Sequence, residues 1–105
     1  MSEDRVKPAV CTKMAEVRHG VDRLDEQIVA LLAERFRYME AAARIKPTRD
    51  AVRDEARKAQ VIANAAAAAA REGLDPQVAA GLYDNLVETS IAYEFERFDL
   101  RTTQV

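Results

Sequence analysis

The sequence predicts an all-α protein with three helices, of which the first is very long. The 105-residue chain is rich in alanine, leucine, glutamate and arginine and contains three glycines and three prolines, a composition that favours helices. Apolar residues recur every three or four positions in three segments, which is the spacing of one helix face. Proline, glycine and aspartate separate these segments, and no strand pattern or internal repeat is present.

Length and charge narrow the class of protein. A chain of this size forms one domain, and we expect a flexible arm over residues 1–10, a helical domain over 11–101 and a tail over 102–105. The net charge is −2, so no overall field attracts nucleic acid or a membrane. One cysteine allows no intrachain disulfide, and neither a bilayer-spanning run nor a signal-peptide core is present, so we expect a cytoplasmic protein.

The first helix is predicted over about residues 12–45, with Thr12 as its N-cap and Glu16 in the first turn. Such a helix is roughly 45–50 Å long at 1.5 Å per residue. The rest of the chain is too short to cover its whole apolar face, so a partner chain is the natural cover. The apolar positions are Val17, Val21, Leu24, Ile28, Leu31, Leu32, Phe36, Met39 and Ala42.

The second helix follows a break at residues 47–50, which contain proline and aspartate. It is predicted to begin near Ala51 or Val52 and to end at about Glu72. Its alanine-rich stretch, residues 64–71, favours close helix packing because small side chains let two backbones approach.

Three turn residues set the start of the third helix. Gly73 suits a left-handed C-cap, Asp75 suits an N-cap, and Pro76 suits the first helical turn. The apolar pattern then continues to about Phe98.

Two cations interrupt the apolar face of the first helix. Arg35 and Lys46 are eleven residues apart, which is three turns plus about 20°, so they share a face with apolar neighbours. One interpretation is that both extend their stems over the core and reach solvent. The other is that they line a cavity that holds an anion. Residue spacing alone leaves both interpretations open.

Arg18 lies near the edge of the same apolar face. It precedes Arg35 by seventeen residues, or roughly 25 Å along the helix axis, so the two cannot meet at one small ligand on their own helix. If two chains pair with their first helices antiparallel, Arg18 of one chain can approach Arg35 and Lys46 of the other.

Further polar candidates lie on the later helices. Ser90 and Glu94 are i,i+4 neighbours at the end of an apolar stripe, where they either mark the edge of the core or face the same cavity as Lys46. Asp54 and Arg57 belong to a mixed-charge run, which is usually a solvated face. The sequence has one histidine, no glycine-rich phosphate loop and no paired metal-ligand spacing. Cations with one hydroxyl and one carboxyl suit a small polyanion.

The segment VRHGVDRLDEQIVALLAERFRYMEAAARIK resembles the first helix of the all-helical chorismate mutases. That helix typically reads R-x-x-I-D-x-I/L-D-x-x-I/L-x-x-L-L-x-x-R, with a lysine three turns further on. The segment GLDPQVAAGLYDNLVETSIAYE resembles the third helix of the family, less strongly, and the resemblance covers about residues 11–98. The matching positions of the first helix are Arg18, Val21, Asp22, Leu24, Asp25, Ile28, Leu31, Leu32, Arg35 and Lys46.

The resemblance implies an intertwined homodimer of three-helix chains with two active sites. It implies that Arg18 is donated by the partner chain, that Arg35 grips a substrate carboxylate and that Lys46 holds a carboxylate and the ether oxygen. Glu94 falls where many members have a glutamine that donates to the ether oxygen. The substrate-binding residues that the resemblance implies are Arg18, Arg35, Lys46, Asp54, Arg57, Ser90 and Glu94.

The implied reaction is the Claisen rearrangement of chorismate to prephenate, which needs no nucleophile, metal or cofactor. The enzyme holds a dianion in a compact chair and stabilises negative charge that develops on the ether oxygen. The catalytic residues would be Lys46, Glu94 and Arg35, and Glu94 can donate to the ether oxygen only when it is protonated.

Lys58 departs from the family pattern, because mutases usually carry at this position a glutamate that accepts a hydrogen bond from the ring hydroxyl of the substrate. In this departure, and in the short loop between Lys46 and Arg57, the sequence resembles the isochorismate-pyruvate lyases. These are sister enzymes on the same fold that form salicylate and pyruvate. The sequence therefore predicts a chorismate mutase, with the lyase as the alternative. A non-catalytic helical dimer that binds an aromatic dicarboxylate or a partner protein is a third hypothesis.

Overall fold

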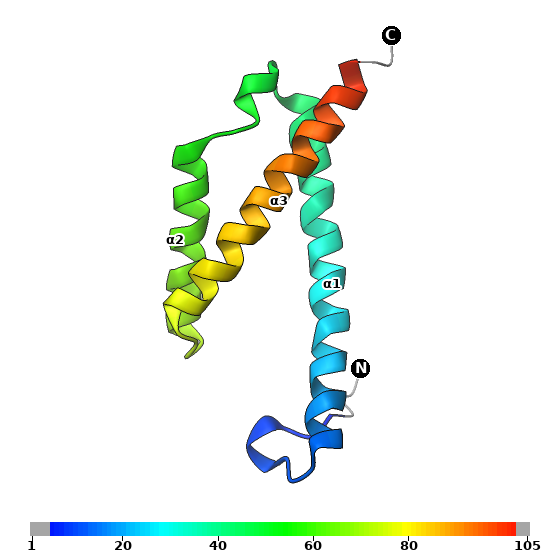
Figure 1. Ribbon diagram of the computed structural model, residues 1–105, viewed down its shortest axis with the longest axis vertical. Coiled ribbons are helices and arrows are strands. Elements are labelled where there is room, and N and C mark those ends of the chain that lie inside the picture. Colours follow the sequence, from blue (N-terminus) through cyan, green and yellow to red (C-terminus); the bar gives the residue numbers. More distant parts are fainter. Residues whose placement is uncertain (1–4, 103–105) are drawn as a thin grey trace. The chain divides into compact units, whose positions relative to one another are not determined.

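The computed structural model describes residues 5–102, which form three α-helices, two short 3-10 helices and no strand (Figure 1). This confirms the predicted all-α fold with a long first helix. Residues 1–4 of the predicted arm and 103–105 of the predicted tail lie outside the described residues. The elements are η1 (Pro8–Val10), α1 (Met14–Ile45), η2 (Arg49–Ala51), α2 (Glu55–Arg71) and α3 (Pro76–Thr102).

The chain divides into two compact units, and α1 runs through the division. Unit 1 is Met1–Phe36 and unit 2 is Arg37–Val105. Unit 1 holds η1 and most of α1, whereas unit 2 holds the last turns of α1 with η2, α2 and α3.

The start of α1 shows why Thr12 is not its N-cap. The carbonyl of Lys13 accepts the amides of Glu16 and Val17 at 3.1 and 3.3 Å, so Lys13 occupies the cap position. The carboxylate of Glu16 accepts the amides of Thr12 and Lys13 at 2.9 and 3.2 Å. The hydrogen bond from Thr12 is the main reason that the pKa of Glu16 is lowered. The predicted cap is therefore wrong by one residue, while the predicted place of Glu16 in the first turn is confirmed.

In unit 1, α1 carries a stripe of apolar side chains that is exposed in the single chain. The exposed fractions run from 38% at Val17 to 67% at Leu31. The spacing alternates between four and three residues, which is the seam that one helix presents to another in a coiled coil. We call this set the α1 stripe, and its members are Val17, Val21, Leu24, Ile28 and Leu31.

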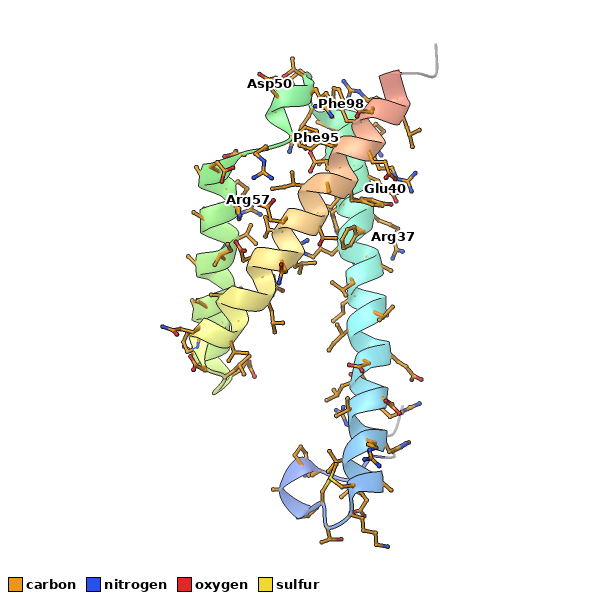
Figure 2. The ribbon with its side chains drawn as sticks, in the orientation of Figure 1. Arg37, Glu40, Asp50, Arg57, Phe95 and Phe98 are labelled. Carbon is orange, nitrogen blue, oxygen red and sulfur yellow. The ribbon has the colours of Figure 1, made fainter. Side chains whose placement is uncertain are left out.

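Unit 2 is built on the packing of α2 against α3, and the chain reverses its direction at the tight turn between these two helices (Figure 1). Ala69 of α2 and Ala79 of α3 are buried, as the alanine-rich stretch predicts for a close helix contact. Figure 2 shows Phe95 and Phe98 of α3 near η2. The core cluster consists of Ala43, Val52, Val87, Ile91 and Phe98, with Val61 and Phe95 partly buried against it.

The second helix begins at Glu55, three residues or more later than predicted. The side chain of Asp54 accepts the amide of Arg57 at 3.0 Å and is the N-cap. The preceding residues serve the core instead, because Val52 is buried and follows the 3-10 turn η2. No local feature of the sequence predicts that Val52 is buried, and this burial moves the start of α2 to Glu55.

The turn between α2 and α3 follows the predicted signals. Gly73 has a φ of +78°, which is left-handed backbone that favours glycine. The amide of Leu74 donates to the carbonyl of Ala69 at 2.9 Å, as in a Schellman C-cap. Asp75 accepts the amide of Gln77 at 2.9 Å, and Pro76 is the first residue of α3.

The third helix ends at Thr102, four residues beyond the predicted end at Phe98. Arg101 lies with its guanidinium 3.9 Å from the ring centroid of Phe98 and donates to the carbonyls of Ala43 and Arg44 at 2.8 and 2.9 Å. These acceptors stand at the end of α1, where free carbonyls and the helix dipole favour a cation. A contact between distant residues therefore extends the helix.

Replacing Gly73 by alanine should lower the free energy of unfolding by about 1 kcal/mol, because an L side chain is strained at this positive φ. Gly81→Ala is the matched control. Gly81 lies inside α3 where an added Cβ meets nothing within 4 Å, so that change should raise the free energy by about 0.5–1 kcal/mol. Urea unfolding followed by circular dichroism at one protein concentration measures both. Equal effects of the two variants would contradict the assigned turn.

Candidate active site

A buried carboxylate and an ammonium meet in unit 2. Nζ of Lys46 lies 2.6 Å from Oε2 of Glu94, and the Glu94 side chain is 6% exposed. The same Nζ donates to the carbonyl of Val52 at 3.4 Å. Three segments therefore meet at this ammonium: the end of α1, the connection before α2, and the middle of α3.

Local structure explains why Lys46 stands at this point. Lys46 directly follows α1, and its amide donates to the carbonyl of Ala42 at 2.9 Å, which continues the hydrogen bonding of the last turn. Pro47 then prevents the helix from continuing. The buried side chain of Val52 holds the connection against the core and brings its carbonyl to the lysine.

Glu94 lies on the buried face of α3 that also carries Val87, Ile91 and Phe98. Taking a carboxylate out of water costs several kcal/mol unless a cation balances it. Oε2 of Glu94 accepts no hydrogen bond of good geometry from the described residues. Its contact with Nζ of Lys46 is therefore a short ion pair without hydrogen-bond geometry. A buried carboxyl that is balanced in this way is a candidate functional group, because a buried ion pair adds little stability over an apolar pair of the same volume.

Ser90 lies one turn before Glu94 on α3 and is 3% exposed. Its hydroxyl donates to the carbonyl of Leu86 at 2.7 Å, which is the usual i−4 back-bond of a helical serine. The structure thus places Ser90 beside Glu94 on the same helix.

Asp54 and Arg57 lie together at the start of α2, where Figure 2 labels Arg57. Asp54 is used as the helix cap, and Nη1 of Arg57 donates to Oε1 of Gln60 at 2.7 Å along the helix. Both residues are exposed.

Arg18 and Arg35 belong to unit 1, where Arg18 is exposed and Arg35 is half-buried. Their grouping with Lys46 around one ligand stays a prediction. Unit 1 also contains a hollow of about 520 Å³ between the segment before α1 and the first turns of that helix, lined in part by Pro8, Cys11 and Val17. The residues that line this hollow all belong to unit 1, and none of them is a predicted site residue.

Sequence reasoning missed the partners of Lys58. Its Nζ lies 2.6 Å from Oε2 of Glu88 and 3.2 Å from Oδ1 of Asp84. Arg53 also contacts Glu88, with its Nη2 2.7 Å from Oε1. Hydrogen bonds from Arg53, and then from Lys58, lower the pKa of Glu88 to about 2, and Glu88 in turn raises the pKa of Lys58. The sequence feature that could have predicted these contacts is the acidic i,i+4 pair of Asp84 and Glu88 on α3.

Comparison with known proteins identifies the family. The profile of the family described as chorismate mutase type II matches residues 17–95. The chain belongs to this family. It is also 33% identical over 89 residues to isochorismate pyruvate lyase of Pseudomonas aeruginosa, an alignment that covers 85% of this chain and 88% of that protein. The protein is therefore an enzyme of the chorismate mutase type II family, which implies a chorismate-type substrate.

The described residues offer neither a metal site nor a membrane span. Between residues 5 and 102, no three histidine, cysteine, aspartate or glutamate side chains are grouped so that they could hold a metal ion. Over the same residues, no helix has the length and apolar character needed to cross a membrane.

Proposed function

We propose that the protein is a chorismate mutase, which converts chorismate to prephenate. The observation that carries the proposal is the buried pair of Lys46 and Glu94, whose charged atoms lie 2.6 Å apart. Both residues stand at positions where the family resemblance expects the groups that act on the ether oxygen. The family match over residues 17–95 supports the same assignment.

The chemistry requires electrostatic help and no group transfer. One C–O bond of the ether breaks while a C–C bond forms within the same molecule, so no proton or electron pair leaves the substrate. Negative charge grows on the ether oxygen, and a hydrogen-bond donor fixed beside that oxygen lowers the barrier. We assign this donation to the ammonium of Lys46 and to the carboxyl of Glu94, which is paired with Lys46 in the free protein and must take up a proton before it can donate. Cations then fix the two substrate carboxylates and favour the compact chair.

We further propose that the active site is completed by a second copy of the chain. Arg18 is too far along its own helix to reach a ligand that contacts Lys46, because 28 residues separate the two. The α1 stripe is exposed in the single chain and has the spacing of a helix–helix seam. In the proposed homodimer the second chain covers this stripe and supplies its Arg18 to the substrate.

Isochorismate pyruvate lyase is the second candidate function, and the contacts of Lys58 favour it. The ammonium of Lys58, held by Glu88 and Asp84, cannot accept a hydrogen bond from the ring hydroxyl as the usual glutamate does. The 33% identical relative from Pseudomonas aeruginosa bears the name of this activity. In that reaction the same ether C–O bond breaks, and a ring hydrogen moves to the side chain, so that pyruvate leaves and salicylate remains.

Side-by-side incubation with chorismate and isochorismate should show turnover of chorismate to prephenate, measured by loss of chorismate absorbance and acid conversion of prephenate to phenylpyruvate. Salicylate fluorescence on isochorismate without prephenate formation would replace the mutase by the lyase. Stable dimers that turn over neither substrate would reject both enzymes in favour of a non-catalytic binding protein.

Activity of the wild type should fall as the pH rises, because Glu94 donates to the ether oxygen only in its protonated form. Glu94→Gln keeps a donor at every pH and should flatten that fall. The measurement is kcat/KM against pH for both proteins. A pH profile that is the same in the variant and the wild type would reject the donor role of Glu94.

Arg18→Ala and Lys46→Gln should each abolish most activity, yet a refolded equal mixture should recover about a quarter of the wild-type rate, because half of the dimers are mixed and each mixed dimer has one intact site. Each variant refolded alone is the control. Mixed dimers without recovery, verified by native mass spectrometry, would show that Arg18 is not donated across chains.

A further inference from the structure

Three hydrogen-bond donors, two from Arg53 just before α2 and one from Lys58 in its first turn, converge on the carboxylate of Glu88. Nη2 and Nη1 of Arg53 donate at 2.7 and 3.2 Å, and Nζ of Lys58 donates at 2.6 Å. Arg53 thus binds the carboxylate in a forked, bidentate way, which is the strong geometry for such pairs. We call Arg53, Lys58 and Glu88 the α2 clamp.

The α2 clamp brackets the turn that carries two predicted substrate-binding residues. Arg53 immediately precedes the N-cap Asp54, and Lys58 immediately follows Arg57. The amide of Arg57 donates to Oδ1 of Asp54 at 3.0 Å, and the amide of Lys58 donates to the Asp54 carbonyl at 2.9 Å. Both ends of this turn are tied to the carboxylate of Glu88 on α3, and Lys58 has a second, longer contact at 3.2 Å with Asp84 of the same helix. The backbone of Arg57 is therefore fixed relative to α3, and Glu88 is the one group that holds both ends.

The same helix carries the buried carboxyl of the candidate site. Glu88 precedes Ser90 by two residues and Glu94 by six, all on α3. A helix of this length is a rigid spacer, so a clamp at Glu88 sets the distance between the first turn of α2 and Glu94.

We propose that Glu88 is a positioning residue for substrate binding, which holds Arg53 and Lys58 and thereby fixes the turn that presents Arg57. The inference rests on the proposed function, in which Arg57 contacts an anionic group of the substrate. It also gives Lys58 a role of its own: the lysine that stands in place of the usual glutamate ties α2 to α3.

The strength of the clamp suits a positioning role. Glu88 and Arg53 are each 41% exposed, and exposed ion pairs stabilise a fold weakly. Loss of the carboxylate should therefore loosen one helical turn and leave the fold intact. Since the pKa of Glu88 is lowered to about 2 by Arg53 and Lys58, the clamp stays charged at every working pH.

Glu88→Gln tests the proposal, because it keeps the size of the side chain and removes its charge. With the substrate that the wild type turns over, we expect KM to rise about 5–10-fold and kcat to stay within about two-fold, since a loosened Arg57 weakens ground and transition states alike. Amide exchange at Arg57 and Lys58, measured by NMR, should accelerate. Glu88→Asp keeps the charge and should recover part of the lost affinity.

Glu55→Gln is the matched control. It removes the other carboxylate that contacts Arg53, at 2.8 Å, and leaves the α2 clamp in place. Its KM and its amide exchange at Arg57 should equal those of the wild type.

The outcomes separate the clamp from the proposed function. An unchanged KM in Glu88→Gln, or a fall in kcat alone, overturns the positioning role when the wild type is active. A wild type that turns over neither chorismate nor isochorismate overturns the proposed function and, with it, the substrate-positioning role. Unaltered exchange at Arg57 and Lys58 overturns the clamp in either case.

Discussion

The contact between Lys46 and Glu94 places the strictest demand on this fold. A carboxylate that is almost fully buried needs a cation beside it, because its uncompensated desolvation would lower the free energy of unfolding of the domain. That requirement fixes the register of α3, because a shift by one residue would rotate Glu94 by about 100° away from the lysine. It also fixes where α1 ends, since Nζ of Lys46 must reach both Glu94 and the carbonyl of Val52.

The connection between α1 and α2 meets this demand by being fastened to α3 at both ends. Before the buried Val52, Arg49 binds Asp99 at 2.8 Å and lies 4.5 Å from the ring centroid of Phe95. After it, Arg53 binds Glu88. A short, mostly exposed segment thereby acquires a defined path, and the backbone carbonyl that holds Lys46 acquires a defined position. The polar surface of α3 thus supports its buried face.

The sequence predicted correctly the helix boundary that interactions within one turn determine. The glycine at Gly73 and the proline at Pro76 act within one turn, so the boundary between α2 and α3 was readable from the residues alone. The start of α2, the end of α3 and the partners of Lys58 depend on burial of Val52 and on contacts formed across 30 to 58 residues. For the site, spacing alone indicated cations on an apolar face and left Glu94 either at the edge of the core or in the same cavity as Lys46, and the family resemblance favoured the cavity.

The guanidinium of Arg101 has a practical consequence for work with this protein. It caps the last carbonyls of α1 from the far end of the sequence, so the final turn of α3 is part of the scaffold that holds Lys46. A truncation made to trim the C-terminus, or a fusion joined inside that turn, would uncap α1 next to the candidate site. Affinity tags and linkers on that side therefore belong after Thr102.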